Sequence, residues 1–301
     1  MDIPDLNKFY DTTKKLIGST IAKAIDDDIL TQGAAIAFYT VFSVAPLFIL
    51  MVSVSDIFLS EEYIRTEVQA LMSDFVGPDI TSSLFQYIGE VNFSASGIFT
   101  TIIASLTLAF GATTVITQLK HTLNIIWNIE SVQINSVWNF LLNRLLSFGV
   151  IILATALLVV SLLAEVVIGI ISEFFSQSFL NIDFGSYLMV TELTTVAFAM
   201  VFFALIFKIL PDVNAPWKDI FVGAIATTAL FMLGKYFIGL YLTASGISTA
   251  YRAAGSLVIF IVWVYYNVQT ILLGAVFTQV YTDMFGGKII PYKYVKLKNQ
   301  P

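Results

Sequence analysis

Long apolar stretches alternate with short polar segments along almost the whole chain. A helix that crosses a membrane needs about 20 mainly apolar residues. Six stretches reach that length, at roughly 32–59, 97–119, 141–172, 187–207, 218–243 and 254–282. Each is a continuous apolar run, whereas the strands of a membrane β-barrel are shorter and alternate. The pattern therefore predicts an all-α, polytopic membrane bundle with six transmembrane helices, forming one membrane domain over 31–285.

Two segments outside these spans also have helical periodicity. In residues 1–30, apolar positions recur three and four apart with lysines between them, at Leu6, Phe9, Thr13, Leu16, Ile17, Ile21, Ala24 and Ile25. This spacing predicts an amphipathic helix, either lying on the inner membrane surface or packing on the bundle as an ordinary cytoplasmic helix. Residues 60–96 hold two apolar stripes separated by Gly77 and Pro78, which predicts an outer helical hairpin, either a lid or a plain packing element.

Composition agrees with a membrane location. Hydrophobic residues make up 57% of the 301 residues and charged residues 12%, whereas soluble domains carry about 25% charged residues. The mean hydropathy is +0.85. These values favour an integral membrane protein over a soluble one.

The positions of the basic residues predict the orientation of the spans. Twelve of the 15 lysines and arginines lie in the N-terminal segment, the second and fourth connections and the basic tail at 286–301. With six spans, all of these segments share one side, and the opposite connections contain only Arg65 and Arg252. Because cytoplasmic loops are enriched in Lys and Arg, both termini are predicted to be cytoplasmic.

Three ionisable residues lie inside the predicted spans: Glu165, Glu192 and Lys235. At about 1.5 Å per residue, the two glutamates lie roughly 7–10 Å, and the lysine about 13 Å, below the outer boundary. Charges at membrane depth are functional candidates by default, and these suggest a cavity open to the outside. The alternatives are a structural ion pair that fixes the packing of the spans, or a lysine that snorkels to the interface. Arg252 and Asp56 lie at the outer ends of spans.

The first span contains a proline near its middle. Pro46 removes one backbone hydrogen bond and kinks a helix, and the hydroxyl of Ser43 can partly satisfy the carbonyls that the kink frees. These two residues are therefore a candidate hinge, with a fixed kink as the alternative.

Several kinds of chemistry have no support in the sequence. The chain has no cysteine and a single histidine, His121, so an ordinary zinc site is not expected. It also lacks a phosphate-binding GxxxxGK[ST] loop and a GxSxG nucleophile turn. The net charge of −6 disfavours nucleic acid as a partner. We therefore expect neither an enzyme nor a bound cofactor or metal.

Several segments resemble the YihY/virulence factor BrkB family of bacterial inner-membrane proteins, which older labels call ribonuclease BN. The resemblance follows the chain in order and rests on "GAAIAFYTVFSVAPLFIL" at 33–50, "TQLKHTLNIIWNI" at 117–129, "GAIATTALFMLGKYFIGLYL" at 223–242 and "YRAAGSLVIFIVWVYYNVQTILLGAVFTQVY" at 251–281. The family pattern carries over to Ser43, Pro46, Lys235, Tyr241, Tyr251, Gly255, Trp263 and Gly274.

The chain departs from the family pattern at two positions. Arg252 stands where the family often has Gly, and Val276 stands in "GAV" where the family commonly reads "GAE". The second change removes a carboxylate, so a mechanism that needs this Glu does not operate here. The resemblance implies a six-span bundle with cytoplasmic termini in the bacterial inner membrane, and a role in envelope lipid transport or export.

These observations lead to one principal hypothesis and two alternatives. The principal hypothesis is an inner-membrane transporter or lipid-translocation component, whose substrate is an anionic phospholipid, a lipopolysaccharide-related lipid or a small anionic solute. The binding residues would be Lys235, Glu192, Glu165, Arg252, Tyr241 and Tyr251. The alternatives are a non-transporting scaffold with an envelope protein partner and, less favoured, a membrane enzyme. An oligomer is compatible with each of them.

Overall fold

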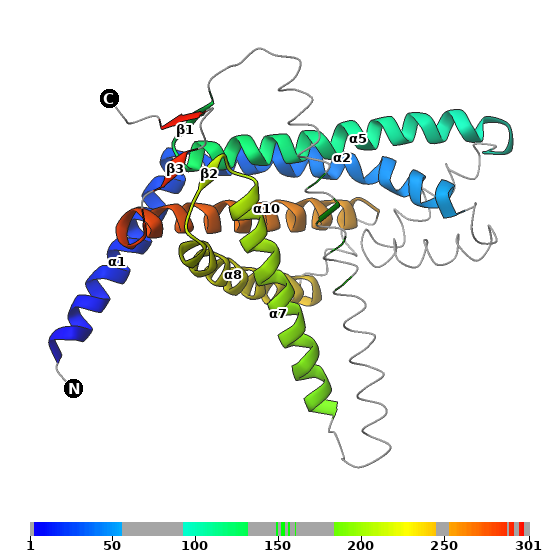
Figure 1. The fold of residues 1–301 in the computed structure, drawn as a ribbon. Coiled ribbons are helices and arrows are strands. Elements are labelled where there is room, and N and C mark those ends of the chain that lie inside the picture. Colours follow the sequence, from blue (N-terminus) through cyan, green and yellow to red (C-terminus); the bar gives the residue numbers. More distant parts are fainter. Residues whose placement is uncertain are drawn as a thin grey trace. The chain divides into compact units, whose positions relative to one another are not determined.

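The computed structural model of the chain is built almost entirely from long helices (Figure 1). It describes residues 3–55, 93–131, 184–244, 253–287, 289–291 and 295–297, with isolated helical positions between 149 and 160. The helices are α1 (Ile3–Asp26), α2 (Ile29–Ser55), α5 (Phe93–Ile126), α7 (Phe184–Ile209), α8 (Trp217–Ala244) and α10 (Ala253–Phe285). The strands are β1 (Ile129–Ser131), β2 (Val213–Asn214), β3 (Ile290–Pro291) and β4 (Val295–Leu297).

The helices confirm the all-α class predicted from the sequence. Within the described residues, three helical segments are long and apolar enough to cross a membrane: Glu192–Ile209, Trp217–Phe237 and Phe260–Phe285. They coincide with the predicted fourth, fifth and sixth spans. Helices α2 and α5 cover most of the predicted first and second spans. The hairpin at 60–96 and most of the third span lie outside the described residues, so the number of six spans stays a prediction.

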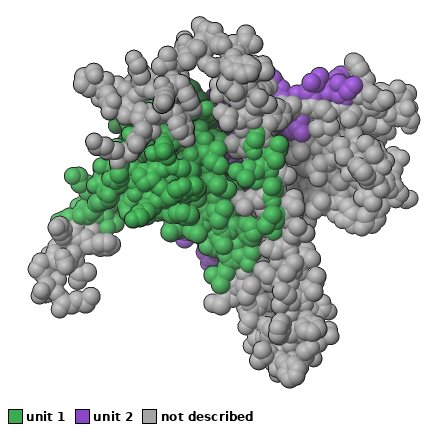
Figure 2. Space-filling model, in the orientation of Figure 1, with its two compact units in different colours: residues 1–29, 119–232, 270–301 green, residues 30–118, 233–269 purple. Residues whose placement is uncertain are grey.

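The chain divides into two compact units, shown in green and purple in Figure 2. Unit 1 comprises residues 1–29, 119–232 and 270–301, and unit 2 comprises 30–118 and 233–269. The boundary passes through α5, α8 and α10 and falls directly after Ile29, the first residue of α2, so the first three helices contribute to both units. The fully buried apolar side chains of unit 1 include Leu123, Ile126, Trp127, Phe207, Ile220, Leu272 and Val276.

Within unit 1, α8 and α10 approach closely through small residues. A Cβ atom on Gly223 would collide with the side chain of Thr278, and one on Gly274 would collide with Thr227. The two helices thus present matching Gly-xxx-Thr segments to each other. The Thr227 hydroxyl donates to the carbonyl of Gly223 at 2.7 Å and the Thr278 hydroxyl to that of Gly274. Small residues at four-residue spacing are how membrane helices pack closely without a hydrophobic driving force.

Short strands in unit 1 join segments that are far apart in the sequence. Strand β1 pairs antiparallel with β4, and β2 pairs antiparallel with β3. Both β3 and β4 belong to the segment after α10, which was predicted only as a basic tail. The described part of this tail therefore folds back onto the connections that follow α5 and α7. We call this region, comprising the end of α1, residues 120–131, 208–217 and 286–297, the polar end of unit 1.

Two helices at the polar end finish with a residue at positive φ. Asp28 has φ 49° after α1, and Asn128 has φ 54° after α5. Left-handed backbone is rare outside glycine, and Asp and Asn tolerate it best. The amide of Asp28 donates to the carbonyl of Ile25, and that of Asn128 to Ile125, at 3.0 and 2.9 Å. These bonds satisfy carbonyls that would otherwise be exposed, and they turn the chain sharply out of each helix.

The Gly223–Thr278 contact predicts a strong response to a single added methyl group. Gly223→Ala should lower the thermal stability of the purified protein in detergent, by about 1–3 kcal/mol, because the methyl group has no room beside Thr278. The matched control is Gly18→Ala, whose added Cβ would meet nothing within 4 Å. Since alanine favours helix over glycine by about 1 kcal/mol, the control should not lose stability. Equal stability of the two variants would contradict the close approach of α8 and α10.

Candidate functional site

The best-defined polar contacts at the polar end centre on Asp212, in the loop between α7 and β2. The side-chain amide of Asn124 donates to Asp212 Oδ2 at 2.9 Å, and the backbone N–H of Asp212 donates to Asn124 Oδ1 at 2.9 Å. Lys120 Nζ lies 2.9 Å from Asp212 Oδ1. Asp212 and Asn124 are 7% and 8% exposed. The carboxylate is therefore neutralised by one cation and held by reciprocal hydrogen bonds, which fixes this loop against α5.

A second lysine, Lys208, holds the residues that follow this loop. Lys208 Nζ donates to Asn214 Oδ1 at 2.6 Å and to the carbonyl of Ala215 at 2.7 Å. It also lies 5.5 Å from the centre of the Trp217 ring. Lys208 is in the last turn of α7, where a cation complements the negative end of the helix dipole. The side chain thus closes α7 and positions the start of α8.

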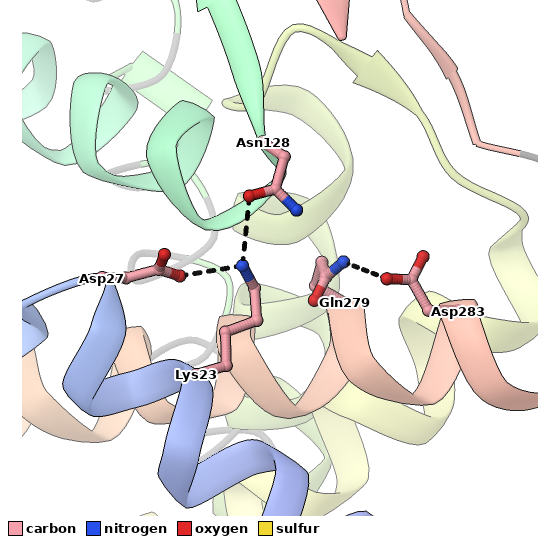
Figure 3. A network of polar contacts seen from close by, with 5 residues as sticks. All are labelled: Lys23, Asp27, Asn128, Gln279 and Asp283. Carbon is pink, nitrogen blue, oxygen red and sulfur yellow. Dashed lines mark hydrogen bonds and ion pairs between the residues drawn. The ribbon is translucent and has the colours of Figure 1, made fainter. Parts of the chain in front are cut away.

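Lys23 links α1 to the turn after α5, as Figure 3 shows. Its Nζ atom lies 3.0 Å from Asp27 Oδ2 and 3.4 Å from Asn128 Oδ1. The same view contains Gln279, whose side-chain amide donates to Asp283 one turn later on α10. Lys23 therefore fixes how the end of α1 sits on unit 1, close to the residue at positive φ.

A further carboxylate is buried where α8 begins. Asp219 is 6% exposed, and a Cβ on Gly286 would collide with its Oδ2 atom. The absence of a side chain at Gly286 thus leaves room for Asp219, in the first turn of α8, beside the end of α10. An Asp in the first turn of a helix also interacts favourably with the helix dipole.

Unit 2 has its own polar cluster, formed by glutamines from three helices. Gln118 Nε2 donates to Gln32 Oε1 at 2.9 Å. The carbonyl of Leu30 accepts from Gln269 Nε2 at 3.3 Å and from the Tyr265 hydroxyl at 3.4 Å. These bonds hold the first turn of α2 to α5 and α10. They are neutral contacts and serve to position the helices.

The predicted binding residues fall on other parts of the chain. Lys235 lies on α8 within unit 2, and its side chain is exposed. Large apolar side chains next to it are also exposed: Leu233 by 55%, Tyr236 by 64% and Phe237 by 63%. Lys235 is therefore part of an exposed surface that combines a cation with apolar and aromatic groups. We call residues 233, 235, 236 and 237 the Lys235 surface.

The remaining candidates are placed only in part. Glu192 lies on α7 within unit 1, where it is exposed beside Leu193. Tyr241 and Pro46 lie within α8 and α2, and Glu165, Tyr251 and Arg252 lie outside the described residues. The Lys235–Glu192 and Lys235–Glu165 pairings thus remain predictions.

The candidate hinge has a more specific environment than the sequence suggested. The Ser43 hydroxyl donates to the carbonyl of Tyr39 at 2.8 Å, whereas Pro46 frees the carbonyl of Phe42. A Cβ on Gly111 of α5 would collide with Ser43 Oγ. Ser43 therefore lies where α2 and α5 approach closely, at Gly111. Its hydroxyl donates to Tyr39 and does not replace the hydrogen bond to Phe42 that Pro46 removes.

Among the residues that the structure describes, no three His, Asp or Glu side chains are grouped so as to hold a metal ion. Val276, at the position where the resembling family commonly has Glu, is fully buried in unit 1. Neither observation assigns chemistry to this part of the chain.

The long apolar helices and their largely lipid-compatible surfaces define a polytopic α-helical membrane protein. Residues 20–291 match the family described as virulence factor BrkB, and the chain belongs to that family. The resemblance inferred from the sequence motifs is thereby confirmed.

Relatives carry the name UPF0761 membrane protein. One from Saccharophagus degradans is 26% identical over 266 residues, which cover 88% of this chain and 59% of the relative. One from Ralstonia nicotianae is 24% identical over 259 residues, covering 85% and 56%. One from Mannheimia succiniciproducens is 26% identical over 282 residues, covering 91% and 92%.

The chain thus spans little more than half the length of the Saccharophagus and Ralstonia relatives. The names of these relatives describe membrane proteins and specify no enzymatic or transport activity. No solved structure matches the chain.

Sequence reasoning missed the residues that organise the polar end. The lysines were used only to predict the orientation of the spans, which applies to Lys120, Lys208 and Lys23. Neither Asp212 nor Asn214 was a candidate. One signal was available: Asp212 is an acidic residue directly after a proline in an otherwise basic connection. Which lysine it pairs with depends on how α5 and α7 pack, and spacing along the chain does not contain that information.

The Asp212 contacts predict a stability effect with a nearby control. Asn124→Ala should lower the stability of the purified protein by about 2–3 kcal/mol, because it leaves the buried Asp212 amide and one carboxylate oxygen without their partner. His121→Ala, at an exposed position one turn earlier on α5, should change stability by less than about 0.5 kcal/mol. Thermal unfolding in the same detergent checks both, and a wild-type midpoint for Asn124→Ala would show that these bonds do not hold the loop.

Proposed function

We propose that the protein is a transporter or lipid-translocation component of the bacterial inner membrane, moving an anionic amphipath through an outward-facing cavity. The observation that carries the proposal is the Lys235 surface. The exposed cation lies on the same two turns of α8 as exposed Leu233, Tyr236 and Phe237, so this part of the helix offers a counter-charge for an acidic head group and apolar contact for the body of such a substrate.

The position of Lys235 along α8 supports this proposal. Lys235 lies within the predicted fifth span at 218–243, eight residues before its C-terminal end, which puts it about 13 Å below that boundary. With this end on the outer side, as the lysine distribution predicts, Lys235 lies in the outer half of the membrane.

The energetics of charge in lipid also favour a binding role. A lysine at membrane depth is costly, and such residues commonly mark substrate or ion pathways. Lys235 is exposed on α8, within the predicted fifth span. We further propose from the sequence that Arg252 also contacts the head group, that Glu165 and Glu192 tune these cations or couple proton movement, and that Tyr241 and Tyr251 contact the ligand.

A non-transporting scaffold is the second candidate. It is favoured by the polar end of unit 1, where β1 and β2 pair with β4 and β3 and build a folded platform from separate segments. In this case Lys235 and an acidic partner are structural pins. The two candidates therefore differ in what the loss of Lys235 does.

The test is the movement of a fluorescent phosphatidylglycerol across proteoliposomes, measured by the fraction that an external quencher reaches over time. Lys235→Ala should slow this movement at least 10-fold, since the head group loses its counter-charge, while thermal stability stays near that of the wild type. The matched control is Lys218→Ala, an exposed lysine at the other end of the same helix, which should leave the rate unchanged.

Other results would favour the second candidate. If well-folded Lys235→Ala moved phosphatidylglycerol at the wild-type rate, Lys235 would not be part of a binding site. Loss of folding in Lys235→Ala, restored when Lys235→Glu is combined with Glu192→Lys, would identify a structural pair and support the scaffold.

A further inference from the structure

Asp219, in the first turn of α8, has a buried carboxylate oxygen that accepts no hydrogen bond from the described residues. The residue is 6% exposed, and no group in the described part of the chain donates to its Oδ2 atom. The backbone amides of Asp219 and Ile220 both donate to the carbonyl of Pro216, at 3.1 and 3.2 Å. Burying an ionised carboxylate without a partner is costly, so the Oδ2 atom requires a positive charge or a donor.

Two other carboxylates of unit 1 have a counter-charge from the chain itself. Asp212 Oδ1 lies 2.9 Å from Lys120 Nζ, and Asp27 Oδ2 lies 3.0 Å from Lys23 Nζ. Within the described ranges, no basic side chain forms an ion pair with Asp219. Asp219 is also the most buried of the three sites that need a cation, apart from Asp212, which already has one. The positive charge that it requires therefore comes from another source.

The end of α10 adds negative potential beside Asp219. A Cβ on Gly286, directly after α10, would collide with Asp219 Oδ2, so the carboxylate lies against the C-terminal turn of that helix. The last carbonyls of a helix have no partner within it and form the negative end of its dipole. The amide of Gly286 donates to the carbonyl of Thr282 at 2.9 Å. The start of α8 favours a carboxylate and the end of α10 disfavours it, so the two dipoles offset each other at Asp219.

The oxygen atoms at this junction are ligands that hard cations prefer. Such cations are held by carboxylate, carbonyl and water oxygens, and the C-terminal ends of helices coordinate Na⁺ in membrane transporters. Asp219 supplies one negative charge, and the last turn of α10 supplies neutral carbonyl groups. Gly286 and Gly287 are exposed, so an ion can approach the carboxylate from the side of these two glycines.

We propose that a hard cation, held by Asp219 Oδ2 and by backbone carbonyls of the last turn of α10, joins the start of α8 to the end of α10. This type of site does not need a group of three acidic or histidine side chains, and the described residues contain none. Backbone ligands leave no motif in a sequence, which is why the sequence predicted no metal. The site lies in unit 1, and it is independent of whether Lys235, in unit 2, binds a substrate.

The test measures how the stability of the full-length protein depends on cations. The purified protein is exchanged in detergent into choline chloride, and choline is then replaced stepwise by Na⁺, K⁺, Mg²⁺ or Ca²⁺ at constant ionic strength. Thermal unfolding is recorded at each concentration, so the four series distinguish the cations. A cation that binds only the folded protein raises the unfolding midpoint with the logarithm of its concentration, once this exceeds the Kd. We expect this response for at least one of the four.

Two variants and a matched control locate the ion. Asp219→Asn should raise the Kd of the responding cation by about 10-fold or more, because the amide carries no charge. Gly286→Ala keeps the charge but places a methyl group against Asp219 Oδ2, and it should also raise the Kd. The control is Asp26→Asn, which removes an exposed carboxylate at the end of α1 and should leave the Kd unchanged. Isothermal titration calorimetry with the same cation checks each Kd independently of unfolding.

Three results would overturn the proposal. A wild-type midpoint that is the same in choline chloride and in all four salts would show that no cation binds, and a loss of stability in Lys288→Gln would then identify the lysine two residues after Gly286 as the counter-charge. A wild-type Kd in Asp219→Asn would show that the ion binds elsewhere. An equal increase of the Kd in Asp219→Asn and Asp26→Asn would show a general attraction of cations to a negative surface.

Discussion

The carboxylate of Asp212 is the interaction on which the arrangement of the polar end depends. It is buried, so it needs both a counter-charge and hydrogen-bond donors, and Lys120 and Asn124 of α5 supply them at 2.9 Å. Holding Asp212 also places β2, which pairs with β3, and leaves Lys208 within reach of Asn214 and Ala215. The position of α8 follows, because Trp217 begins immediately after this loop. One satisfied charge thus relates α5, α7, α8 and the chain after α10.

Close packing of small residues is the second kind of contact between the helices of each unit. Gly223 and Gly274 accept the threonines of the opposite helix in unit 1, and Gly234 accepts the ring of Tyr266 in unit 2. In lipid, apolar surface gains little by moving from a hydrocarbon tail to another helix, so the shape of the contact decides which helices associate. Unit 1 therefore combines ion pairs and short strands at its polar end with glycine contacts between α8 and α10, and unit 2 combines neutral hydrogen bonds with the Gly234–Tyr266 contact.

The sequence was sufficient to predict the helices, but not which segments and side chains contact one another. Helix α1 and the spans over α7, α8 and α10 were predictable, because apolar run length and helical period are local properties. The strand pairs were not, since β1 meets β4 only through the fold. For the same reason Lys23, Lys120 and Lys208 looked like interchangeable positive charges, although each has a different partner. Lys235 stood out only because charge is rare within an apolar run, and its partners depend on packing that no local pattern encodes.

The return of the C-terminal segment to earlier parts of the chain has a consequence for biosynthesis. Strands β1 and β2 emerge from the ribosome long before β3 and β4, and their partners do not yet exist during the insertion of the intervening helices. The polar end of unit 1 can be completed only after α10 has been synthesised. Strands β3 and β4 therefore pair last and complete the fold of the polar end. A chain that ends before them would leave the edges of β1 and β2 unpaired, and cellular quality control can recognise such edges.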